Sequence, residues 1–137
     1  MRKILAFSCL ALIVCATLLC GCTSDDRFGN TIAEMGDLTQ PEMIGLNESI
    51  ANHDYNDSRV HCSKLIAIED TYLPRLAAIT VSEKYRPPTQ YMITGFEKQR
   101  RGCQVLLNSS DDDLGASMAY FSESANDFQR ALDTWPE

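Results

Sequence analysis

Histidine, cysteine and acidic side chains are the residues of this chain that could bind a metal ion. His61 lies next to Cys62, but neighbouring residues on a helix point about 100° apart, so these two side chains would not converge on one ion. The sequence contains no C-x-x-C or H-E-x-x-H spacing. The aspartates at 111–113 lack the alternation and the distal glutamate of a calcium loop, and they are more typical of a helix start. We therefore expect no metal site.

The sequence also gives no sign of a catalytic serine or of a phosphate-binding loop. The chain has several serines, but no nucleophile elbow marks one of them as activated, and no glycine-rich loop is present that could hold a phosphate. We expect neither enzymatic activity nor a bound cofactor.

Three basic residues lie close together in this acidic chain, namely Lys98, Arg100 and Arg101. Glu97 can pair with Arg101 one helical turn away, which is typical of a solvated helix face. The alternative is a contact site for an acidic partner or an anionic glycan. Both interpretations stay open from the sequence.

Three triplets match the acceptor pattern for N-linked glycosylation, and they begin at Asn47, Asn56 and Asn108. The pattern is common by chance. Asn56 and Asn108 lie near expected helix ends, where a glycan would fit.

The strongest sequence signal is the amino-terminal leader. Arg2 and Lys3 precede an uncharged apolar run over residues 4–19, which is the pattern of an export signal. The run ends in Leu19-Cys20-Gly21-Cys22, which resembles the lipobox of prokaryotic lipoproteins. That resemblance covers only the leader, and it implies cleavage before Cys22 and attachment of lipid to the Cys22 sulfur. The alternative is an uncleaved membrane helix, because a span needs roughly 20 apolar residues.

Cleavage would leave ten basic residues against 19 acidic ones. A surface this acidic argues against nucleic-acid binding, which needs a concentrated positive face. It also argues against adhesion to anionic lipid, so the acyl anchor would be the membrane contact. We expect a protein held on the extracytoplasmic side of a cell membrane.

Two cysteines would remain besides Cys22, and they are Cys62 and Cys103. An exported chain enters compartments that favour disulfides, so an even pair predicts one bridge. Both cysteines lie in apolar stripes of expected helices, on either side of a turn near residue 82. The alternative is a pair of free buried thiols.

Apolar residues recur at helical spacing in four segments, 39–51, 54–81, 87–107 and 114–135. Asn52-His53-Asp54 and the proline-containing stretch 82–88 separate the first three, and Pro74 predicts a kink or a split in the second. The fold class is therefore all-α, a small antiparallel bundle of about four helices arranged as two hairpins. We divide the chain into a signal peptide (1–21), a flexible tether (22–38) and a helical domain (39–137).

Two functions are compatible with these features. The first is an interaction or structural module that presents a helical surface to another envelope protein or polymer. The second is a solute-binding or sensory domain, with a pocket between helices near Tyr72, Tyr91, Phe96 and Tyr120. A lined cavity would favour the second, and a filled core the first.

Overall fold

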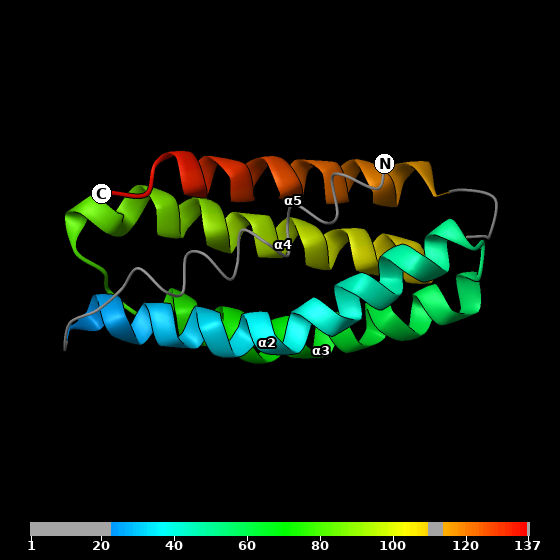
Figure 1. Ribbon diagram of the computed structural model, residues 1–137, viewed down its shortest axis with the longest axis horizontal. Coiled ribbons are helices and arrows are strands. Elements are labelled where there is room, and N and C mark those ends of the chain that lie inside the picture. Colours follow the sequence, from blue (N-terminus) through cyan, green and yellow to red (C-terminus); the bar gives the residue numbers. More distant parts are fainter. Residues whose placement is uncertain (1–22, 110–113, 137) are drawn as a thin grey trace.

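The computed structural model describes residues 23–109 and 114–136, and these residues form four α-helices (Figure 1). The helices are α2 (Ser24–Ala51), α3 (Tyr55–Ala77), α4 (Arg86–Asn108) and α5 (Gly115–Asp133), with a short 3-10 turn, η1 (Glu83–Tyr85), before α4. The expected all-α class with about four helices is confirmed.

The helices pack as two antiparallel hairpins. Helix α2 packs against α3, α4 packs against α5, and the contact between α3 and α4 joins the two hairpins. In Figure 1 the start of α2, the connection between α3 and α4, and the end of α5 therefore lie together at the left end of the bundle. The connection between α2 and α3 lies at the opposite end.

The expected flexible tether over 22–38 is wrong for the residues that the structure describes. Ser24 already belongs to α2, and Phe28, Ile32 and Met35 are almost completely buried in the core. Their spacing of four and three residues places them on one helical face, and burying that face stabilises the helix despite the polar residues between them. Pro41 consequently lies inside α2 rather than at its start, and Figure 1 shows the second half of the helix at an angle to the first.

The other helix ends follow local chemistry. Asp54 caps α3 by accepting a hydrogen bond from the amide of Asp57 over 3.1 Å. Pro74 lies in the last turn of α3, and the helix ends at Ala77 without being split. The expected extension to residue 81 is therefore too long. Helix α4 begins with prolines in its first turn, as its sequence predicts.

The core has two apolar clusters, one at each end of the bundle. The cluster near the start of α2 contains Phe28, Ile32, Met35, Leu76, Met92, Phe96, Phe128 and Ala131. The cluster near the α2–α3 connection contains Met43, Leu46, Cys62, Leu65, Cys103, Leu106 and Phe121.

Each helix also places a buried polar residue between these two clusters along its length. These residues are Thr39 in α2, Glu69 in α3, Gln99 in α4 and Ser124 in α5, which we call the polar layer. Thr39 and Ser124 satisfy their hydroxyls on backbone carbonyls, those of Gly36 and Gly95 respectively. Glu69 and Gln99 do not complete their hydrogen bonding within the described residues, because both oxygens of Glu69 and Nε2 of Gln99 lack a partner there.

Candidate functional site

The two cysteines of the helical region face each other across the contact between α3 and α4. Cys62 and Cys103 are both fully buried, and both are free thiols. A hydrogen bond with Cys62, together with burial, raises the pKa of the Cys103 thiol. The predicted juxtaposition of the two side chains is therefore confirmed, whereas the predicted disulfide bond is not formed.

Glu69 lies on the same face of α3 as Cys62, two helical turns further along. Burial raises the pKa of Glu69 well above its ordinary value, although the positive charge of Arg100 acts in the opposite direction. Glu69 also lines a surface hollow of about 340 Å³ between α3 and α4, together with Asp70, Glu97 and Arg100. The thiol pair and Glu69 form a buried column of titratable groups that no motif in the sequence marks.

A second group of polar residues lies between α2 and α3. Nδ1 of His61 donates to Glu42 over 2.7 Å, and Nε2 of His61 is 3.5 Å from Asp57. The imidazole lies against Gly45, where a β-carbon would be 2.2 Å from the ring. Partial burial alone would raise the pKa of Glu42, but hydrogen bonds from His61 and Lys64 lower it below its ordinary value.

These carboxylates occupy opposite edges of the His61 ring, so they do not converge on one point. Within residues 23–109 and 114–136, no group of three or more His, Cys, Asp and Glu side chains is placed to hold a metal ion. The aspartates at 111–113 lie outside the described residues. The Glu42–His61 contact depends on the register of two helices, which the sequence alone does not reveal.

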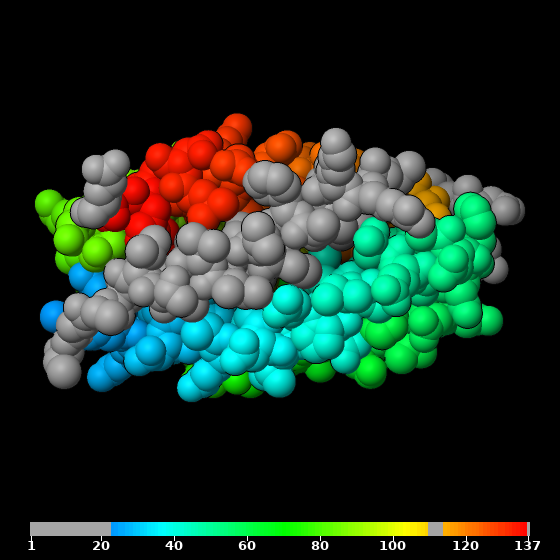
Figure 2. Space-filling model, in the orientation of Figure 1, coloured from blue at the N-terminus to red at the C-terminus, as the bar shows by residue number. Residues whose placement is uncertain are grey.

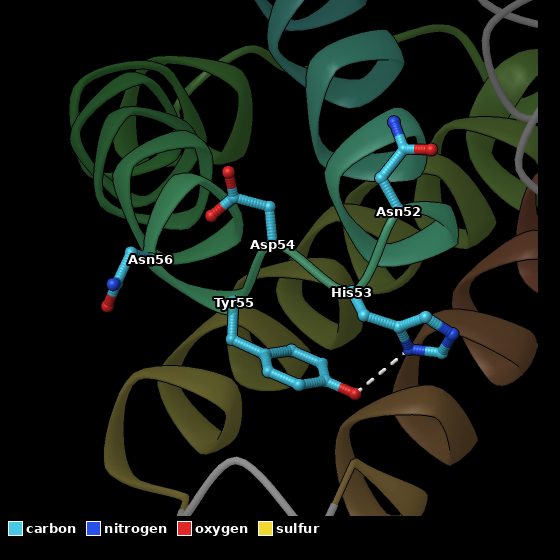
Figure 3. Close-up of a pocket in the computed structure, with 5 residues that line it drawn as sticks. All are labelled: Asn52, His53, Asp54, Tyr55 and Asn56. Carbon is cyan, nitrogen blue, oxygen red and sulfur yellow. Dashed lines mark hydrogen bonds between the residues drawn. The ribbon is translucent and has the colours of Figure 1, made fainter.

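The connection between α2 and α3 forms a shallow polar hollow of about 410 Å³ (Figure 3). Its lining runs from Asn52 to Asn56, and His53 adopts a positive φ of 58° there. Nδ1 of His53 forms a 3.2 Å hydrogen bond with the hydroxyl of Tyr55, and Figure 3 shows both side chains on the same side of the connection. The side chain of Asp54 points away from them, toward the start of α3.

The three candidate glycosylation sites differ in accessibility. Asn47 is half-buried, whereas Asn56 and Asn108 are exposed. The serines that complete the first two triplets, Ser49 and Ser58, are buried and hydrogen-bonded to each other over 2.9 Å. An enzyme that reads the serine hydroxyl would therefore have to act on these two triplets before the chain folds.

The three basic residues do not form one surface. Lys98 pairs with Asp127 of α5 over 2.7 Å, and this hydrogen bond raises the pKa of Lys98. Arg100 pairs with Asp70 of α3 on the opposite side of α4. Arg101 is exposed and reaches Gln104 of its own helix at 3.5 Å. Lys98 and Arg100 are thus paired with carboxylates of two different helices, and Arg101 contacts no carboxylate within the described part of the chain.

Of the four aromatic residues considered for a pocket, three meet at one apolar cluster, and Tyr120 lies apart from it. Phe96 is fully buried, and its ring packs edge-on against Phe128 with centroids 4.9 Å apart. Tyr72 and Tyr91 pack against the same apolar cluster, which leaves this region filled by side chains. Tyr120 lies eight residues before Phe128 on α5, roughly 12 Å away along the helix.

Cys22 and the rest of the leader lie outside the described residues. None of the helices in the described part of the chain is long and apolar enough to cross a membrane. No family model, curated protein or solved structure matches this chain.

Proposed function

We propose that this protein is a lipid-anchored helical module of a prokaryotic cell envelope, held on the extracytoplasmic face of a membrane through Cys22. The observation that carries the proposal is the leader, with its basic start, its apolar run and the lipobox-like Leu19-Cys20-Gly21-Cys22. The filled core around Phe96 supports an interaction or structural role over solute binding.

The buried thiol pair is consistent with export. In an oxidising compartment Cys62 and Cys103 would lose two protons and two electrons to the local thiol oxidant and become a disulfide. Their contact in the core means that this bond requires little movement of α3 and α4. We include the Cys62–Cys103 disulfide in the proposal for the mature protein.

The partner we expect is another envelope protein or an envelope polymer. Cross-linking in intact cells followed by mass spectrometry tests this directly, with the Cys22→Ala protein as the matched control. We expect one recurrent envelope component with the native protein and loss of that cross-link in the control. Cross-links to cytoplasmic proteins alone, or none above background, would argue against the proposed role.

A further inference from the structure

Helix α2 begins almost immediately after the proposed lipid site. Thr23 precedes the first helical residue, Ser24, and its amide donates to the carboxylate of Asp26 over 2.6 Å. Thr23 directly follows Cys22, and one residue spans at most about 3.6 Å. A lipid on Cys22 would therefore hold the start of α2 against the bilayer with almost no slack.

The antiparallel topology brings two other segments to this same end, namely the α3–α4 connection and the end of α5. The amide and the hydroxyl of Ser82 both donate to the carboxylate of Asp25, each over 2.7 Å, which attaches the α3–α4 connection to the start of α2. Trp135 follows the end of α5, and its ring packs against the ring of Tyr85, with the two centroids 5.6 Å apart. In Figure 2 this end is at the left, where the blue start of α2, the light-green start of α4 and the red end of the chain meet.

The side chains gathered there suit a lipid–water boundary. Tyr85 and Trp135 are half-buried, and Nε1 of Trp135 is buried, so Trp135 presents only apolar ring atoms. Lys84 and Arg86 are exposed, and Lys84 Nζ lies 4.7 Å from the centre of the Tyr85 ring. We call these four residues the anchor-end surface. Tyrosine and tryptophan rings favour the head-group level of a bilayer, and lysine and arginine can place their charges among phosphates while their stems stay in apolar surroundings.

We propose that the anchor-end surface lies in the head-group layer of the membrane, so that the bundle stands on this end. The inference rests on the proposed lipid anchor at Cys22. A membrane fits this surface better than a protein partner because the short connection leaves no gap in which a folded partner could be accommodated. Asp25, Asp26 and Glu83 lie at the same end and offset the positive charges, so the surface orients the bundle on a neutral bilayer rather than binding anionic lipid by itself.

This orientation has a consequence for partners. Helix α2 has 28 residues, so it places the α2–α3 connection roughly 40 Å from the membrane. The polar hollow from Asn52 to Asn56 would then be the most distant feature of this hairpin and would face the envelope space.

Trp135 makes the proposal testable because it is the only tryptophan in the chain. The full-length protein, processed in cells and extracted from membranes, would be reconstituted into phosphatidylcholine vesicles that carry brominated lipids at known depths. We expect the emission of Trp135 to shift to shorter wavelength relative to unlipidated protein of residues 23–137, which lacks the apolar leader, mixed with the same vesicles. We also expect loss of most of the emission when the bromines lie near the head groups.

A matched control moves the tryptophan to the opposite end, in a Trp135→Phe protein that also carries Tyr55→Trp. Its emission should be unaffected by any brominated lipid. If the native protein floats with the vesicles but Trp135 is not quenched, the orientation is wrong and the anchor stands. If the protein does not float with the vesicles, the anchor itself is wrong, and the orientation fails with it.

Discussion

The ring of Phe121 occupies the space that a side chain on Gly102 would need. A β-carbon built on Gly102 would lie 2.8 Å from this ring, and one on Gly95 would lie 2.7 Å from the ring of Phe128. The two glycines are seven residues apart on α4 and the two phenylalanines seven apart on α5, so the contact repeats after two turns. The absence of side chains at these glycines lets α4 and α5 approach closely along their length.

We predict that Gly102→Ala destabilises the protein by about 1–3 kcal/mol, because the rigid ring of Phe121 must shift within a packed core. Denaturant unfolding measures the change. Gly115→Ala is the control, since Gly115 is exposed in the first turn of α5 and its substitution should change stability by at most about 0.5 kcal/mol. Equal midpoints for the Gly102→Ala and native proteins would show that the helices are not this closely packed.

The same helix provides a test of the core. Phe121 and Phe128 are almost completely buried, so Phe121→Ala or Phe128→Ala should each cost roughly 3–5 kcal/mol. Glu123 is exposed, and its 3.5 Å ion pair with Lys98 is open to solvent and therefore weak. Glu123→Ala should consequently change stability by less than about 0.5 kcal/mol. Unfolding midpoints that ranked these variants in the reverse order would place the wrong face of α5 in the core.

Glu69 predicts a pH dependence of stability. The pKa of Glu69 is raised in the folded protein. Below about pH 4, Glu69 is protonated in both the folded and the unfolded chain, so burying it carries no ionisation cost there. As the pH rises, the unfolded chain releases this proton while the folded protein retains it, and stability falls. The nearby charges of Asp70 and Arg100 are the same in the native protein and in the Glu69→Gln protein.

Glu69→Gln should therefore stabilise the protein by about 1–3 kcal/mol near pH 7, and the gain should shrink toward about pH 4. Urea unfolding at several pH values measures this difference, with Glu97→Gln as the control at an exposed position of the same hollow. A Glu69→Gln protein that is less stable than the native one near pH 7 would mean that the folded protein stabilises an ionised Glu69.

The thiol pair gives a prediction that depends on redox state. A bond between Cys62 and Cys103 closes a loop of 41 residues, which stabilises the fold by roughly 4 kcal/mol on a chain-entropy basis. Protein purified without reductant and then unfolded should resist thiol labelling. The folded protein should lose stability when a reductant is added, whereas Cys103→Ala protein should not respond to reductant. Full labelling of both cysteines in unfolded, unreduced protein would show that the disulfide is absent.

Local sequence signals accounted for much of the fold. The cap at Asp54, the prolines at 87 and 88, and the stripe through Phe121 and Phe128 indicated three helices and their connections. The first half of α2 was missed although Phe28, Ile32 and Met35 have helical spacing, because the glycine, asparagine and aspartate residues within and around this stretch suggested a loop. In this segment, tertiary burial overcame weak local propensity.

Some contacts of the candidate sites could be predicted from the sequence, and others could not. The facing of Cys62 and Cys103 could be predicted, since it needs only two apolar stripes and one turn. The contacts of His61 with Glu42 and of Lys98 with Asp127 could not, because each depends on the register between neighbouring helices. The polar layer also depends on that register, and no short motif marks its residues.

The mass of the intact protein extracted from membranes tests the lipid anchor most directly. We expect a species that begins at Cys22, lacks residues 1–21 and carries the added mass of acyl chains, and we expect Cys22→Ala to abolish this form. A native species that retains residues 1–21 and carries no acyl mass would contradict a lipid anchor at Cys22.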